Sequence, residues 1–99
     1  MKSFNERCYE ILRRVPKGKV TTYKDLAKAM NTKAYRAVGN AMNKNPYAPE
    51  VPCHRVIQSD GSLGGFASGT KKKIQMLKAE GVEIINGKIN LDKYRYKLR

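Results

Sequence analysis

The 99-residue chain lacks the features that mark several large classes of protein. It has no apolar run close to the ~20 residues of a membrane-spanning helix, and its N-terminus has no apolar core typical of a signal peptide. Its two cysteines do not suggest a disulfide framework. We therefore expect a soluble, cytoplasmic protein that folds as one domain over residues 1–99.

Acidic residues are also scarce. Eight Asp and Glu stand against 21 Lys and Arg, which gives a formal net charge of +13. The eight acids are scattered and do not suggest the paired carboxylates of glycoside hydrolysis. So large a positive excess makes a polyanion the first partner to consider, with nucleic acid and a membrane surface as the rival choices.

The chain contains a single histidine, His54, and it follows Cys53 directly in the segment Val51-Pro52-Cys53-His54-Arg55-Val56-Ile57. A cysteine is a useful nucleophile as its thiolate, and a nearby base or positive charge is the usual way to form one. Neighbours in an extended segment point to opposite sides, so a water would connect the thiol and the imidazole. The alternative is that Cys53 is a small buried hydrophobe. Cys8 and this pair lack regular ligand spacing, so we expect no metal site.

Apolar periodicity predicts helices over residues 3–15, 22–30, 33–43 and 70–80. In the first, Cys8 falls on the buried stripe and has a structural role. In the last, Ile74 and Leu77 point inward, and Gly81 ends the helix. The predicted caps are Ser3 with Glu6, Thr22 with Asp25, and Thr70.

The second and third helices, joined by a tight turn at Asn31-Thr32, read as a helix-turn-helix. One face of the third helix is apolar and consists mostly of small residues, namely Ala34, Ala37, Val38, Ala41 and Met42. Its opposite face carries only basic and amide side chains, namely Lys33, Arg36, Asn40, Asn43 and Lys44. Such a face suits phosphates and base edges. An ordinary solvated face is the alternative.

Short strands are expected near Val20 and Val56, and Asn86-Gly87 predicts a type I′ hairpin. The glycine-rich segment 63–69 has no phosphate-loop pattern and is either a flap over a site or a plain connector. The sequence does not decide which structure the basic tail from residue 93 adopts. Together these features predict a mostly helical α/β fold, a winged-helix-like (helix-turn-helix) domain with short strands and a C-terminal β-hairpin.

Five segments, in this order and spacing, resemble the C-terminal domain of the methylated-DNA–protein-cysteine methyltransferases, also called alkylguanine-DNA alkyltransferases. The resemblance covers the chain roughly from Phe4 to Gly81. The segments are Thr22-Tyr23-x-x-Leu26-Ala27, Arg36-Ala37-Val38-Gly39-x-Ala41-Met42-x-x-Asn45-Pro46, Pro52-Cys53-His54-Arg55-Val56, Gly64-Gly65-Phe66 and Lys73-x-x-x-Leu77-x-x-Glu80-Gly81.

The resemblance implies that Cys53 accepts an alkyl group from the O6 atom of guanine in duplex DNA, once per molecule and without a cofactor or metal. It further implies that His54 takes the thiol proton through a water and that Glu80 holds His54. Tyr23 would donate a proton or hydrogen bond to the guanine. The acceptor would be a monomer.

The resemblance also implies how the nucleotide is presented. The third helix would enter the minor groove, where Arg36 replaces the extruded nucleotide and Lys33 and Asn40 contact DNA. The remaining implied contacts are Asn45 as a brace near the site, Met42 as a wall of the alkyl pocket, the carbonyls of Cys53 and Val56 on the guanine amino group, and Ala67 and Ser68 in the flap.

The chain departs from the family in two ways. It has no counterpart of the N-terminal domain of larger members. Ala67 stands where serine is usual, and the adjacent Ser68 is the substitute, while Phe66 in place of tyrosine keeps a stacking ring. Two other classes remain open: a non-catalytic alkyltransferase-like sensor, although such proteins usually carry tryptophan in place of the cysteine, and a basic helix-turn-helix regulator, which would leave the Cys-His pair unused.

Overall fold

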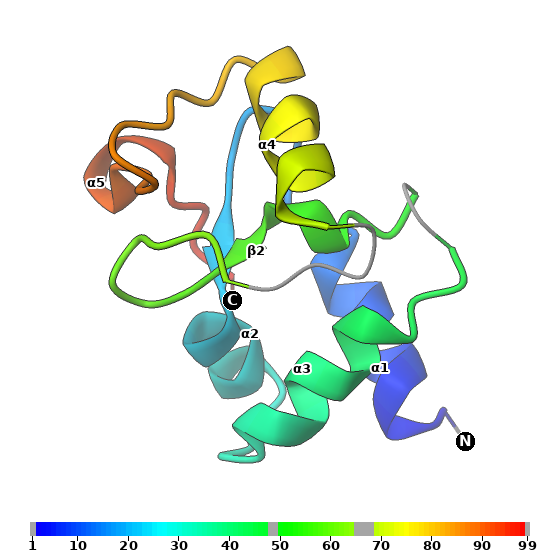
Figure 1. Ribbon diagram of the computed structural model, residues 1–99. Coiled ribbons are helices and arrows are strands. Elements are labelled where there is room, and N and C mark those ends of the chain that lie inside the picture. The colour runs from blue at the N-terminus through cyan, green and yellow to red at the C-terminus, as the bar shows by residue number, and fades with distance from the viewer. Residues whose placement is uncertain (1, 48–49, 65–68, 99) are drawn as a thin grey trace.

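Two groups of helices lie on either side of a small sheet (Figure 1). The computed structural model describes residues 2–47, 50–64 and 69–98. Its elements are α1 (Phe4–Leu12), β1 (Thr21–Thr22), α2 (Tyr23–Ala29), α3 (Tyr35–Asn43), the 3-10 helix η1 (Cys53–Arg55), β2 (Val56–Ile57), α4 (Thr70–Ala79) and α5 (Leu91–Tyr94). The mostly helical fold expected from the sequence is confirmed. None of the described helices is long and apolar enough to cross a membrane.

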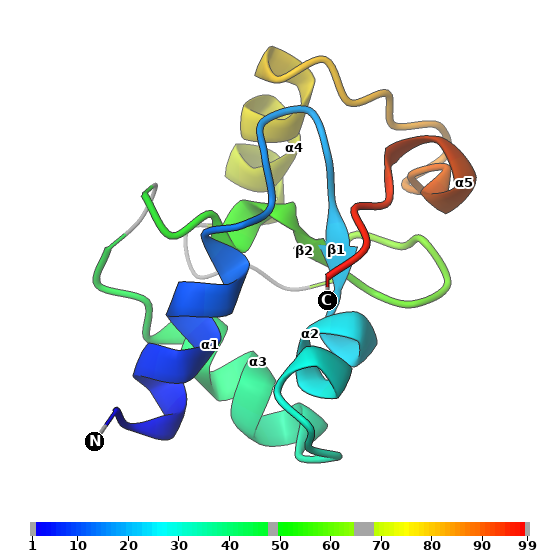
Figure 2. The ribbon, with the colours of Figure 1, turned by 180° about the vertical axis from the view of Figure 1, so that it is seen from behind.

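The sheet joins distant parts of the chain. β1 and β2 pair in parallel, with Thr21 opposite Val56 and Thr22 opposite Ile57. The C-terminal tail lies along the other side of β1: Val20 donates to the carbonyl of Tyr94 and accepts from Tyr96, both at 2.8 Å. Figure 2 shows this red segment passing beside β1. The tail is therefore part of the fold.

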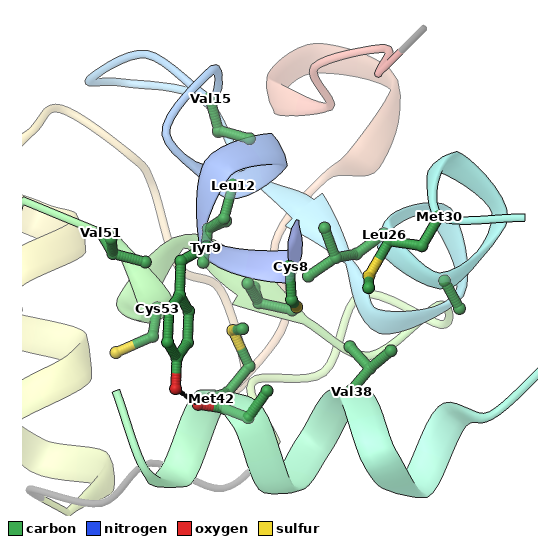
Figure 3. Close-up of a cluster of buried hydrophobic side chains, with 13 residues drawn as sticks. Cys8, Tyr9, Leu12, Val15, Leu26, Met30, Val38, Met42, Val51 and Cys53 are labelled. Carbon is green, nitrogen blue, oxygen red and sulfur yellow. Dashed lines mark hydrogen bonds between the residues drawn. The ribbon is translucent and has the colours of Figure 1, made fainter. Parts of the chain in front are cut away.

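Successive residues of a strand point to opposite faces, and β2 uses this to divide two cores. Val56 packs into the first core with α1, α2 and α3 (Figure 3). Ile57 packs into the second core with residues of α4, α5 and the neighbouring loops. Residues just before and after β2 therefore lie at the boundary between the two cores.

The helices α1 and α2 of the first core begin at the caps that the sequence predicts. The hydroxyl oxygens of Ser3 and Thr22 accept from the backbone N–H groups of Glu6 and Asp25, at 3.2 and 3.0 Å, so both predicted caps are confirmed. Of the predicted apolar stripe, Cys8, Leu12 and Val15 are buried, and Phe4 and Ile11 are partly buried.

The turn between α2 and α3 centres on Asn31, which has φ +56°. Asparagine is among the few residues that adopt this left-handed conformation readily. α3 buries Val38, Ala41 and Met42. The five basic and amide residues predicted for its outer face are exposed. Ala34 was expected inward but precedes α3 and is exposed, because the helix begins at Tyr35.

Two details of the second core differ from the expectations. Gly69, with φ +95°, precedes the first helical residue of α4, so the cap predicted at Thr70 was wrong. Lys73 is fully buried, whereas Ile74 is only partly so.

The predicted type I′ turn is confirmed by positive φ at Asn86 and Gly87. Ile85 and Lys88 flank it and exchange hydrogen bonds of 2.9 and 3.0 Å.

Tyr9 offers a direct test of the packing between α1 and α3. Its hydroxyl donates to the carbonyl of Ala41 at 2.8 Å, in the last turn of α3, where helical carbonyls lack partners of their own. Removing the donor leaves a buried carbonyl unsatisfied. Tyr9→Phe should therefore lower the free energy of unfolding by about 1–2 kcal/mol in urea denaturation. The half-exposed Tyr35 provides the control, and an equal loss in Tyr35→Phe would refute this account.

Candidate active site

The site is organised around Cys53, at the start of η1. The sequence suggested an extended segment here, which was wrong: the Arg55 N–H bonds the Pro52 carbonyl at 2.9 Å and closes a 3-10 turn. Cys53 is 6% exposed. In Figure 3 its sulfur points away from the other labelled side chains of the first core. The turn therefore presents the thiol at the edge of that core, immediately before β2.

The imidazole of His54 enters a network with one carboxylate. Its Nε2 atom lies 2.9 Å from Oε2 of Glu80, the C-cap residue that follows α4. Arg55 donates to the same carboxylate from Nε at 2.8 Å and from Nη2 at 2.5 Å. Its Nη1 donates to the carbonyl of Val15 at 2.9 Å. A carboxylate can only accept, so neutral His54 carries its proton on Nε2 and keeps the lone pair of Nδ1.

Burial decides the charge of His54. The side chain is 2% exposed, and this desolvation lowers its pKa below the ordinary value. The hydrogen bond and charge of Glu80 act in the opposite direction but do not prevail. Burial alone would raise the pKa of Glu80, yet the hydrogen bonds from Arg55 and His54 outweigh it and the pKa is lowered. At neutral pH the network thus holds a neutral imidazole against a charged carboxylate.

Lys73 is the residue that the sequence reading missed. Its Nζ atom donates to the carbonyls of Val56 and Leu63, each at 2.6 Å, and the side chain is 0% exposed. Burial lowers its pKa from 10.5 to about 8, and the charge of Cys53 opposes that change. Lys73 therefore ties β2 to the segment beyond it, within electrostatic reach of the thiol. The sequence did contain a signal for its burial: Lys73 lies four residues before the buried Leu77 and therefore on the same face of the helix.

Tyr23, the first residue of α2, is partly buried and packs against the first core. Burial, and then the charge of Cys53, raise its pKa, so the phenol stays protonated at neutral pH and is able to donate. A Cβ atom on Gly64 would lie 3.4 Å from the Tyr23 ring and 3.1 Å from Nε2 of Gln58. The beginning of the glycine-rich segment therefore packs directly against Tyr23.

The helix α3 and the loop after it complete the surroundings. Arg36, Lys33 and Asn40 face solvent, whereas Met42 is buried in the same core as Cys53. Asn45 donates from Nδ2 to the carbonyl of Val51 at 2.7 Å, which braces the approach to η1. The expected flap residues 66–68, including Ala67 and Ser68, lie outside the described residues.

Comparison with known proteins identifies the family. Residues 3–82 match the model of the 6-O-methylguanine DNA methyltransferase DNA-binding domain, and the chain belongs to this family. It is 51% identical over 81% of its length to a methylated-DNA–protein-cysteine methyltransferase of Thermococcus kodakarensis. It is 47% identical over 89% of its length to a bifunctional methyltransferase/endonuclease of Picrophilus torridus. The chain spans 45% and 30% of these two relatives.

A solved structure matches almost the whole chain. Atl1 of S. pombe, in complex with damaged DNA containing O6-carboxymethylguanine, has a TM-score of 0.86 and 33% identity. The match covers 98% of this chain and 99% of that one. The chain therefore shares the arrangement of helices and strands of that structure.

The buried amine predicts a distinctive pH dependence. Between pH 8 and 10.5 the folded protein binds fewer protons at Lys73 than the unfolded chain, so this residue's contribution to stability rises with pH. Relative to Lys73→Met, the wild type should gain up to about 3 kcal/mol of unfolding free energy over that range. Urea titrations at several pH values measure the difference. The exposed neighbour in Lys72→Met should show no such trend, and a flat difference for Lys73→Met would refute the burial of a titrating amine.

Proposed function

We propose that this protein repairs DNA by transferring the alkyl group from the O6 atom of an alkylated guanine to Cys53, irreversibly and once per molecule. The reaction needs no cofactor, and a monomeric chain carries it out in the cytoplasm, with residues 1–99 acting as one domain. The observation that carries the proposal is the thiol of Cys53 on the turn that also holds the buried His54–Glu80–Arg55 network.

The chemistry is a displacement at the alkyl carbon. His54, neutral and with Nδ1 free of the Glu80 contact, accepts the thiol proton through a water, and the charged carboxylate stabilises the resulting imidazolium. The sulfur then bonds to the alkyl carbon while the carbon–oxygen bond breaks. Its electron pair leaves with the guanine, to which Tyr23 donates a proton or hydrogen bond. The product is a thioether, and the described residues of the site offer no way to regenerate the thiol.

For the reaction to occur, the bound DNA must place the alkyl carbon of the guanine next to the sulfur of Cys53. The alkyl group lies inside the duplex, so the nucleotide must rotate out of the stack. Arg36 and Asn40 on α3, and Lys33 just before it, face solvent without an interspersed acid, which suits insertion into the minor groove, with Arg36 filling the vacated place. The carbonyls of Cys53 and Val56 read the guanine amino group. Met42 lines the alkyl pocket, Asn45 braces the turn, and Ala67 and Ser68 belong to the flap.

The alternative is a sensor that binds alkylated DNA without reacting. The structural similarity to Atl1, with a TM-score of 0.86, favours it, whereas the cysteine at position 53 favours transfer. Mass spectrometry separates the two. After incubation with duplex DNA containing 6-O-methylguanine, the wild type should gain the mass of one methylene on the peptide that contains Cys53.

The control is Cys8→Ala, which keeps the reactive thiol and should gain the same mass, while Cys53→Ser should gain none. Tight, lesion-dependent binding with no mass gain would instead establish a sensor. Equal binding to damaged and undamaged DNA would establish neither a sensor nor an acceptor but a general DNA-binding protein.

Glu80→Gln tests the network behind the thiol. The amide keeps the size of the side chain but loses the charge that stabilises the imidazolium. We expect the single-turnover rate constant for methyl transfer to fall at least tenfold and His54→Gln to lower it by about a hundredfold. Glu83→Gln removes an exposed carboxylate three residues further on and should leave the rate unchanged. Normal rates in Glu80→Gln would show that His54 needs no charged partner.

A further inference from the structure

The C-terminal tail, residues 94–98, lies beyond residues 3–82, which the family model covers. It nevertheless holds the strand that leads into the proposed reaction site. Val20 exchanges two backbone hydrogen bonds with Tyr94 and Tyr96, and this parallel bridge places the tail beside β1 (Figure 2). On its other side β1 pairs with β2, which directly follows the turn η1. The tail is therefore the outer partner of a strand whose inner partner begins next to the reactive turn.

The side chains of the tail alternate between the protein interior and solvent. Tyr94 is buried in the second core, and Tyr96 and Leu98 pack against the first core. Arg95 and Lys97, which lie between them in sequence, are exposed. The inner contacts fix the register of the tail, and this register brings Arg95 to the outer side of the sheet beside α2.

Arg95 reaches from the tail to the first turn of α2. Its Nε and Nη2 atoms donate to the two carboxylate oxygens of Asp25 at 2.7 and 2.6 Å, a bidentate geometry that fixes orientation as well as distance. The side chain of Asp25 is only 15% exposed, so the pair is partly shielded from solvent. The backbone N–H of Asp25 donates to the hydroxyl oxygen of Thr22 at 3.0 Å. Asp25 is therefore held through its side chain and through its backbone.

Tyr23 belongs to the same helical turn as Asp25. Successive residues of an α-helix are rotated by about 100°, so Tyr23 and Asp25 project about 200° apart, from nearly opposite sides of the helix. Holding the Asp25 side keeps the first turn from rotating about its axis, and this limits where the phenol ring on the other side can lie. The ring packs there against Gly64, at the beginning of the glycine-rich segment.

We infer that Arg95 is a positioning residue for the proposed transfer: through Asp25 it holds the phenol of Tyr23 where donation to the guanine requires it. The inference rests on the proposed function, in which Tyr23 is the donor. Arg95 acts through the ion pair and the helix, and it makes no contact with the nucleotide in this account. A displacement of about 1 Å costs up to about a hundredfold in rate, so a surface ion pair affects the reaction more than the stability.

Single-turnover methyl transfer from duplex DNA containing 6-O-methylguanine, at saturating DNA, tests the inference. Arg95→Gln should lower the rate constant about three- to tenfold, and Asp25→Asn should have the same effect. Lys97→Gln removes an equal charge from the next exposed position of the tail and should leave the rate constant unchanged. Because Arg95 is 48% exposed, its replacement should leave the chain folded, which circular dichroism checks.

A double-mutant cycle with Tyr23→Phe separates positioning from a general loss of structure. Tyr23→Phe alone should lower the rate constant about tenfold or more, and adding Arg95→Gln should cause no further loss, because the phenol hydroxyl is already absent. An equal loss from Arg95→Gln in both backgrounds would overturn the inference and leave the transfer reaction in place. An unchanged rate in either single variant would do the same. Absence of transfer by the wild type would instead refute the proposed function, and the inference with it.

Discussion

The carboxylate of Glu80 is the contact on which the rest of the site depends. It accepts from His54 and twice from Arg55, and Arg55 also reaches the carbonyl of Val15. The end of α4, the turn that carries Cys53 and the chain after α1 are thus held by one ion pair. Arg55 is only 15% exposed, so it needs a charged partner in this position. The interaction that fixes the thiol's position is therefore also one that keeps the two halves of the fold together.

The same network sets the protonation state of the imidazole through a balance of opposed effects. Burial disfavours a cation at His54, whereas the carboxylate favours one, and burial prevails. Had the carboxylate prevailed, the ring would be protonated in the resting protein and unable to accept a proton. Arg55 contributes to this outcome, because it shares the negative charge of Glu80 and its own charge lowers the pKa of His54. The ion pair between Arg55 and Glu80 thereby helps to keep the imidazole of His54 neutral.

The features that were predicted correctly from the sequence depend on interactions between residues close together in the chain. The caps at Ser3 and Thr22, the hairpin turn and the basic face of α3 depend on neighbours within a few residues, and all were found in the structure. Pairing of the tail with Val20 was not predictable, since it depends on a contact between distant segments. Lys73 was missed for another reason. Lysine is rarely buried, and only the carbonyls of Val56 and Leu63, supplied by the tertiary fold, make its burial possible.

The two cysteines show why exposure alone is a poor guide to reactivity. Cys8 and Cys53 are both buried, at 0% and 6% exposure, and both belong to the first core. Burial raises the pKa of Cys8 to about 12, so this side chain is an inert thiol. The charge of Cys53 raises the pKa of Tyr23 and opposes the lowering of the pKa of Lys73, which places a phenol and an amine within its electrostatic reach. Cys8 likewise raises the pKa of a phenol, that of Tyr9, whereas Cys53 also lies within reach of the buried amine of Lys73. The buried amine beside β2 therefore distinguishes the surroundings of Cys53 from those of Cys8, in keeping with the proposed role of Cys53 as the nucleophile.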